Sequence, residues 1–461
     1  MRPEEGGPAG YSRASSARVI VAASLSPVTS SRKSWAILGA LTLLGVSVPS
    51  ARAAEVTRVV TALDENDTFD FNLTAAWFHD AHSAAINREL EGFGNGIQVV
   101  RDLKYAQTTD LLDLRTDFGI LWDVGLHVDL PIILAQSNNL TFDQGVNAGN
   151  STFVRDGIYP SYNGTSSTVF QSPTRKGLQY LGLGIQWAPF NQKRDDTKPT
   201  WTLGFDADLD VFKDMRFDPA NPTGNTGVGL GYHQLIWSTW VSKRFRHFDP
   251  YFGATYMLPI RTNGSIYQEL GGGQSSVNPQ QLAAVIIGVE EVAWENPSGD
   301  QRVTVELQAH AAEHFGGRGT SELWEPLSGH PGCTLTATTI AEQCRTSLDV
   351  ATDAMGNPHA APYPGVTDID AYGSFGGEAG LNIQVGKYIR FRSLFGMTFD
   401  APHFITNASA GVDTNHDGRV DSTDPKEANP TYRESIDIPG RRFRVEDSKD
   451  WHLFVQGSLM F

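Results

Sequence analysis

The chain has 461 residues and a formal net charge of -16 at pH 7, from 52 acidic and 36 basic residues. This acidic balance excludes the basic surface that nucleic-acid binding needs, so no nucleic-acid partner is expected. Beyond the N-terminal region, no apolar run reaches the roughly 20 residues of a membrane-spanning helix. No shift in composition divides the chain, and one large all-β unit fits its length as well as several smaller domains do.

The N-terminal region has the three parts of a secretory signal. Two basic residues precede the apolar stretch Trp35–Val48, and Ala51-Arg52-Ala53 follows it. A basic segment, an apolar segment too short to span a bilayer and a small-residue cleavage site together predict export. We therefore expect residues 1–53 to be an N-terminal extension and signal peptide, and residues 54–461 to be the exported domain.

The end of the chain predicts a β-strand. From Trp451 to Phe461 the odd positions are mostly apolar and the even positions are mostly polar. Such period-two alternation places the two sets on opposite faces of a strand. A final strand that ends on an aromatic residue resembles that of bacterial outer-membrane β-barrel proteins, which include porins and other channels. The resemblance implies a multi-pass barrel in outer-membrane lipid, and recognition of the strand ending in Phe461 by the barrel-assembly machinery.

Similar alternating segments recur along the chain. With the terminal strand they number about twelve, within a range of roughly ten to fourteen. The other predicted strands are Phe69–Trp77, Leu112–Trp122, Leu126–Ile132, Leu178–Trp187, Trp201–Val211, Gly229–Val241, Tyr251–Pro259, Leu282–Trp294, Arg302–Ala312, Ala371–Val385 and Tyr388–Phe399.

The linkers between these segments alternate in length. Those after even-numbered strands are short, as in Asp123-Val124-Gly125 and Gly386-Lys387. Those after odd-numbered strands run to roughly 15–60 residues, beyond ordinary loop lengths. This alternation is typical of a transmembrane antiparallel up-and-down β-barrel with short periplasmic turns and long extracellular loops. The sequence therefore predicts this all-β fold, with both chain ends in the periplasm.

A segment of the last long loop carries oxygen ligands at EF-hand spacing, with Gly418 at the sixth position of twelve. It resembles EF-hand calcium loops of the dockerin kind, and this resemblance implies a structural Ca²⁺ within an extracellular segment, residues 405–430. The second repeat and the cohesin-binding helices of a dockerin are missing, so cohesin binding is not implied. An acidic turn without metal is the alternative. The implied ligands are Asp413, Asn415, Asp417, the carbonyl of Arg419, and Asp424.

Cys333 and Cys344 are the two cysteines of the chain. Because an exported chain passes through an oxidising compartment, a disulfide that closes a small loop is expected between them.

If the apolar face of each strand contacts lipid, ionisable side chains line the lumen. Mixed acids and bases there fit an electrostatic constriction for small polar solutes, or a closed ion-pair network that plugs the barrel. We expect the pore, because inward glycines such as Gly182, Gly184, Gly204, Gly376 and Gly380 leave space. The predicted lining residues are Asp113, Arg115, Asp117, His127, Asp129, Asp206, Asp208, Glu306, Glu378, Arg390 and Arg392.

Two motifs resemble catalytic sites, but the expected strand geometry of the first and the expected solvated position of the second argue against catalysis. The segment from His310 to His314 matches the zinc motif H-x-x-E-H, but on a strand these two side chains lie roughly 13 Å apart. His79, Asp80, His82 and Ser83 gather at the outer end of the first strand, where a solvated rim is expected.

The resulting hypothesis is a passive outer-membrane channel for a small polar solute, and not an enzyme. A surface structural or adhesion barrel with a blocked lumen is the alternative. A lipid hydrolase that uses the first-strand histidine and Ser83 is the third possibility.

Overall fold

The computed structural model describes residues 54–60, 70–92, 94, 96–159, 162, 166–217, 221, 223–267, 269–328, 350–352, 358–360 and 363–461. All of them belong to one compact unit, residues 48–461. The predicted signal peptide and the predicted disulfide between Cys333 and Cys344 lie outside the described residues.

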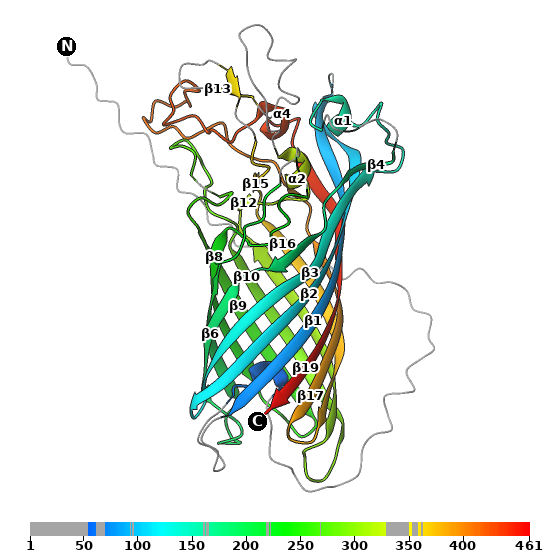
Figure 1. Cartoon of the computed structure of the whole chain (residues 1–461), viewed down its shortest axis with the longest axis vertical. Helices are drawn as coiled ribbons and strands as arrows, with labels where there is room; N and C mark the ends of the chain where they lie inside the picture. Colours follow the sequence, from blue (N-terminus) through cyan, green and yellow to red (C-terminus); the bar gives the residue numbers. More distant parts are fainter. Residues whose placement is uncertain are drawn as a thin grey trace, which may run out of the picture. The chain divides into compact units, whose positions relative to one another are not determined.

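Within the described chain, twelve antiparallel strands close into a barrel (Figure 1). Each pairs with the next long strand, and the first pairs with the last, where the Thr74 and Ser458 hydroxyls lie 3.0 Å apart. The predicted up-and-down barrel and its strand number are thus confirmed. The strands are β1 (Phe71–Gly92), β2 (Gly96–Leu121), β3 (Val124–Phe142), β6 (Leu181–Phe190), β7 (Thr200–Leu209), β8 (Tyr232–Ser242), β9 (Phe248–Arg261), β10 (Leu282–Glu295), β11 (Arg302–His314), β16 (Tyr372–Val385), β17 (Ile389–Asp400) and β19 (Phe443–Met460).

Short elements make up the rest of the described secondary structure. They are η1 (Glu55–Thr57), α1 (Thr152–Arg155), β4 (Thr168–Gln171), β5 (Arg175–Leu178), β12 (Gly317–Gly319), α2 (Trp324–Leu327), β13 (Val350–Thr352), β14 (Pro358–Ala360), β15 (Thr367–Ile369), β18 (His403–Phe404) and α4 (Glu434–Asp437). Within the described part of the chain, no helix has the length and apolar character needed to cross a membrane.

Period-two alternation decides which side chains point outward from the barrel wall and which point into the lumen. Outward positions carry exposed apolar side chains, such as Ile287 and Phe395, which are 59% and 52% exposed. Small outward residues, among them Gly377 and Ala309, leave an apolar hollow of about 890 Å³ on this outer face. The outer face of the barrel is therefore apolar and its inner face polar, which is the reverse of a water-soluble barrel.

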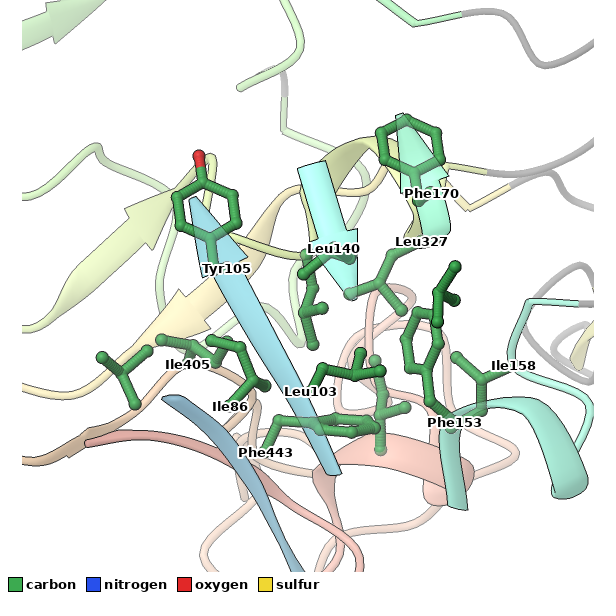
Figure 2. Packing of buried hydrophobic residues seen from close by; sticks show 14 of the residues in the cluster. Ile86, Leu103, Tyr105, Leu140, Phe153, Ile158, Phe170, Leu327, Ile405 and Phe443 are labelled. Atoms are coloured by element: carbon green, nitrogen blue, oxygen red, sulfur yellow. The ribbon is translucent and has the colours of Figure 1, made fainter. Parts of the chain in front are cut away.

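The outer halves of β1, β2, β3 and β19 extend beyond the barrel wall and support a cap. The cap consists of α1, β4, α2, β15 and α4 packed against these strands around one apolar core (Figure 2). Leu103, Leu140, Phe153 and Phe443 meet there with no solvent exposure. Because so much apolar area is removed from water, the cap is held by its own hydrophobic core.

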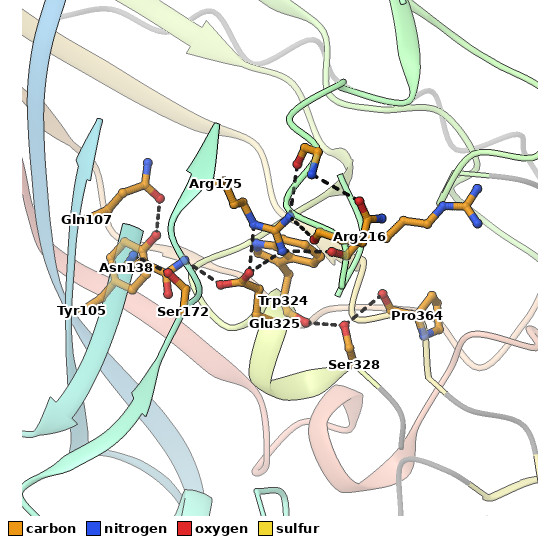
Figure 3. Close-up of polar contacts among 12 residues, drawn as sticks. Tyr105, Gln107, Asn138, Ser172, Arg175, Arg216, Trp324, Glu325, Ser328 and Pro364 are labelled. Carbon is orange, nitrogen blue, oxygen red and sulfur yellow. Dashed lines mark hydrogen bonds and ion pairs between the residues drawn. The ribbon is translucent and has the colours of Figure 1, made fainter. Parts of the chain in front are cut away.

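A buried ion pair adds to the cap (Figure 3). Arg175 donates to one carboxylate oxygen of Glu325 at 3.0 Å from Nε and at 2.5 Å from Nη2. Its Nη2 also donates to the backbone carbonyl of Arg216 at 3.0 Å. The other Glu325 oxygen accepts from Asn138 on β3 at 2.9 Å. The guanidinium also lies over the Trp324 ring.

The predicted long loop after the first strand is wrong. β1 continues to Gly92 and β2 begins at Gly96, so a short turn joins them. Residues 78–111 are too polar to show the alternation of a membrane strand. Residues 78–92 still pair with residues on β2 from Gly96 onward, because backbone hydrogen bonds between adjacent strands do not depend on side-chain polarity. The other short turns, including the one at Gly386, are as predicted.

Residues 54–60 enter the barrel at the short-turn end (Figure 1, dark blue). The Thr57 hydroxyl lies 2.7 Å from that of Ser242 on β8, and Thr202 on β7 donates to the Thr57 carbonyl at 2.9 Å. The Glu55 N–H donates to Glu290 on β10 at 2.7 Å. This N-terminal segment therefore contacts several walls of the lumen at once.

Candidate functional site

The strand register places all eleven predicted lining residues on the inner face of the barrel. Across β1, β2 and β3, for example, Thr74 stands opposite Arg115, which stands opposite Asp129. The hydroxyls of Thr74 and Ser458 meet on the inner face of the barrel. Arg115 and Asp129, which stand in the same row of paired residues, therefore also point inward. The same register connects the remaining predicted residues around the barrel.

One side of the lumen is strongly acidic, and we call it the acidic wall. Arg115 contacts Asp117 at 2.8 Å and Asp129 at 3.8 Å. His127 shares a hydrogen bond with Asp206 and lies 3.5 Å from Asp129. Five aspartates therefore share one arginine and one histidine. The acidic wall consists of Asp113, Arg115, Asp117, His127, Asp129, Asp206 and Asp208.

The opposite side of the lumen holds a compact ion pair. The fully buried carboxylate of Glu306 accepts from Arg392 Nη2 at 2.7 Å and from Nε at 3.1 Å. Tyr251 and Asn382 donate to the same carboxylate at 2.8 Å and 3.0 Å. Since both oxygens are fully used, this part of the lumen is a closed network of the kind that stiffens a barrel.

A third group lies where β11, β16, β17 and β19 adjoin. Glu378 contacts His452 at 3.2 Å and His310 at 3.8 Å, and His310 also bonds Thr398 at 2.9 Å. The segment from His310 to His314 is part of strand β11, as predicted, so the two imidazoles of the H-x-x-E-H match do not converge.

Arg390 binds the N-terminal segment. Its Nη1 donates to both carboxylate oxygens of Glu55, at 2.9 and 2.7 Å. Burial raises the pKa of the Glu55 carboxyl, but the nearby guanidinium of Arg390, helped by Arg302 and Arg392, more than reverses this and lowers the pKa. The remaining space beneath Glu55 is a cavity of about 20 Å³.

The expectation that the inward glycines leave empty space beside the wall is wrong. Each accommodates a side chain from an adjacent strand: a Cβ at Gly184 would overlap His127, one at Gly204 would overlap Ser238, and one at Gly380 would overlap Leu394. The glycines thus let neighbouring side chains lie flat against the wall.

Several functional residues were not found from the sequence. Glu290 and Tyr251 lie on predicted strands, and alternation alone would have placed both inside the lumen. Glu55 has no such signal, because nothing in its local sequence predicts that residues 54–60 enter the barrel.

The predicted calcium loop is ordered by hydrogen bonds within the protein. Asp413 accepts from the Gly418 N–H at 2.9 Å, and the fully buried Glu427 accepts from the N–H groups of Asn415 and Asp421. Asp424 accepts from the Lys426 N–H at 2.9 Å. Calcium binding by this loop stays a prediction.

The first-strand cluster does not form a catalytic pair. His79 pairs with Asp110 at 2.9 Å, and His82 lies 3.8 Å from Glu322. Among the described residues, no hydrogen bond joins Ser83 to an imidazole. These residues lie within a paired strand and not on a solvated rim at its end.

Comparisons with known proteins give only distant likenesses. No family model matches the sequence, and no curated protein matches it. An outer membrane channel from Pseudomonas putida F1 is 7% identical, covers 84% of this chain and 95% of its own, and has a TM-score of 0.37. The monoaromatic hydrocarbon channel TodX is 10% identical, covers 84% of this chain and 90% of its own, and has a TM-score of 0.30. The outer membrane protease OmpT from Escherichia coli is 6% identical, covers 88% of this chain and 100% of its own, and has a TM-score of 0.28. At these identities and TM-scores, none of the likenesses assigns a function to this chain.

Proposed function

We propose that the protein is an outer-membrane β-barrel channel for small polar solutes. The membrane location is supported by the apolar outer face and by the aromatic side chains at the short-turn end of the barrel. Trp122, Trp187, Trp294, Tyr388 and Phe461 are each at least half exposed there. Indole and phenol rings favour the boundary between lipid and water, and an exposed apolar band is stable only in contact with lipid.

The observation that carries the channel proposal is the residual exposure of charged side chains inside the lumen. The side chains of Arg115, Asp206 and His452 are 29%, 24% and 22% exposed. They come from strands on different sides of the barrel. A lumen that served only as a sealed core would bury such groups completely or replace them by apolar ones.

Two parts of the molecule restrict passage in this structure. The N-terminal segment fills the lumen at one end, and the cap lies over the other. We infer that the channel is closed here and that opening displaces the N-terminal segment, because hydrogen bonds and one ion pair hold it, whereas an apolar core holds the cap.

The test is single-channel conductance of the refolded mature chain, residues 54–461, in a planar bilayer. Discrete steps whose size grows with salt concentration are expected, with more frequent openings when residues 54–60 are deleted. A barrel that migrates as a folded, heat-modifiable species and passes no current in either form would contradict the proposal.

A second candidate is a surface structural or adhesion protein with a blocked lumen. The specific observation in its favour is the cap, which has a buried apolar core of its own. The silent outcome of the conductance experiment would favour this candidate. Calcium binding and recognition of the terminal strand by the barrel-assembly machinery stay predictions under both candidates.

A further inference from the structure

Two inward glycines of β6 bring side chains from both neighbouring strands together. His127 on β3 and Asp206 on β7 both stand opposite Gly184. A Cβ at this glycine would overlap the His127 imidazole and the Asp206 carboxylate. The absent side chain therefore lets residues from two strands that are not adjacent meet across a third.

The next row of the barrel repeats this arrangement. Asp129 and Asp208 both stand opposite Gly182. A Cβ built there would lie 3.2 Å from Asp208 Oδ1 and 3.3 Å from Asp129 Oδ2, so these two oxygens face the same space. Four potential ligands are thus gathered on one patch of the acidic wall.

The ligand atoms of His127, Asp129 and Asp206 all lie within 4.8 Å of one another. Among the described residues, this is the one such group of three histidine, cysteine or acidic side chains. The imidazole is 1% exposed, so its orientation is fixed by the packing around it. A fixed imidazole beside carboxylates is a typical donor set for a divalent transition metal.

Nearby carboxylate oxygens lack partners. Asp208 is 7% exposed, and its carboxylate has no hydrogen bond or ion pair among the described residues. One buried oxygen each of Asp113 and Asp129 also lacks a hydrogen-bond donor. A buried carboxylate without a partner is unfavourable, and five aspartates with one arginine leave an excess of negative charge.

We propose that the acidic wall binds one divalent transition-metal ion, with His127 Nε2, Asp129 and Asp206 as ligands and Asp208 completing the site. The nitrogen ligand favours zinc and its neighbours over calcium or magnesium, which prefer oxygen alone. Bound there, the ion joins β3 to β7 across β6, and its two positive charges offset half of the excess of four negative charges that five aspartates and one arginine leave. The site goes beyond the channel proposal and does not require that the barrel conduct.

The experiment titrates Zn²⁺ into the refolded, untagged mature chain after treatment with a chelator. Binding is measured by calorimetry, and by the visible absorption of Co²⁺ as a replacement ion. We expect one Zn²⁺ per chain at this site. Millimolar Ca²⁺ or Mg²⁺ should displace neither the bound Zn²⁺ nor the bound Co²⁺. No binding by a folded wild-type barrel, or displacement by Ca²⁺, would overturn the proposal.

Variants locate the site. Asp206→Asn and Asp208→Asn should each weaken Zn²⁺ binding by more than about tenfold, and His127→Gln should also remove the nitrogen signature from the Cu²⁺ electron paramagnetic resonance spectrum. Gly184→Ala should abolish binding by filling the space between the ligands. His452→Gln is the matched luminal control, and Asp413→Asn tests the predicted calcium loop as a competing site.

The outcomes separate this proposal from the channel. Full Zn²⁺ affinity in both Asp206→Asn and Asp208→Asn would place the ion elsewhere and refute the site, whether or not the barrel conducts. Because both substitutions are nearly isosteric, they test the site even if the His127 or Gly184 variant does not fold. A silent barrel that binds Zn²⁺ at His127 would refute the channel and leave the site intact.

Discussion

The carboxylate of Glu55 accepts two hydrogen bonds from the guanidinium of Arg390, which lies 335 residues further along the chain. This contact joins residues 54–60 to the inner wall of the barrel on β17, one of the last strands. It lies at the short-turn end of the barrel, where the N-terminal segment also contacts Ser242 and Glu290. The segment is therefore bound on three sides, and each contact offers a way to test whether it is the gate.

Removing the charge that holds the segment should open the channel. Arg390→Gln is expected to raise the ratio of open to closed time by about tenfold to a hundredfold, because a hydrogen bond to a charged group contributes about 1.5–3 kcal/mol. Single-channel recording measures this ratio. Arg419→Gln is the control, since Arg419 is an exposed side chain of the last long loop. Unchanged gating in Arg390→Gln would show that the segment is not the gate.

Fixing the segment covalently should have the opposite effect. The Thr57 and Ser242 hydroxyls lie 2.7 Å apart, so cysteines at both positions place their sulfur atoms within reach of a disulfide. In Thr57→Cys with Ser242→Cys, oxidation should suppress current and a reductant should restore it. Wild-type protein given the same reductant controls for effects at Cys333 and Cys344. Equal current before and after reduction would mean that solute passes with the segment in place.

The cap should lose stability as pH rises. Burial raises the pKa of Asp437 to about 7 and that of Asp368 to about 6. A carboxyl whose pKa is higher in the folded state stabilises the fold fully below its unfolded pKa, near 4. That contribution is lost as pH rises to about 7. Hydrogen exchange of residues 405–441, corrected for intrinsic rates, should be at least about tenfold slower at pH 5 than at pH 8.

Asp437→Asn is the matched variant for this pH effect, because it keeps the size of the side chain and removes its titration. Its exchange rates should depend much less on pH across the same range. If the wild type and this variant show equal pH dependence, another group is responsible for the transition.

The buried ion pair of the cap should be costly to break. Glu325→Ala leaves the Arg175 guanidinium, which is 3% exposed, without its carboxylate. Removing one partner of a buried pair destabilises by about 3–5 kcal/mol. The cap should then be cleaved by protease while the barrel stays folded. Glu269→Ala, which breaks an exposed pair with Arg261, should cost at most about 1 kcal/mol and leave the cap resistant.

The predicted calcium loop can be tested separately from the zinc site. If the loop binds Ca²⁺, millimolar calcium should protect residues 413–424 from proteolysis, and Asp417→Ala should remove that protection. His127→Gln should leave it unchanged. Equal protection with and without calcium in the wild type would show that the hydrogen bonds to Asp413, Asp424 and Glu427 order the loop without the ion.

The sequence by itself determined the strands and the faces of their side chains. In a strand, side-chain direction depends only on parity, so alternation from Asp113 to Asp117 sufficed to place these groups inside the barrel. Parity also identified His127, Asp206 and Arg392 as lumen residues. It could not say which of them would meet, because that depends on the register of each strand against its neighbours.

Only the tertiary structure decided what fills the lumen. The pairing of Arg390 with Glu55 requires residues 54–60 to enter the barrel, and no local pattern encodes a contact between residues so far apart. The sequence also suggested that Gly184 leaves space, whereas closure of the sheet brings His127 and Asp206 over it. The extension of β1 to Gly92 was missed for a related reason: outside the apolar band, strand pairing rests on backbone hydrogen bonds and leaves no alternation to read.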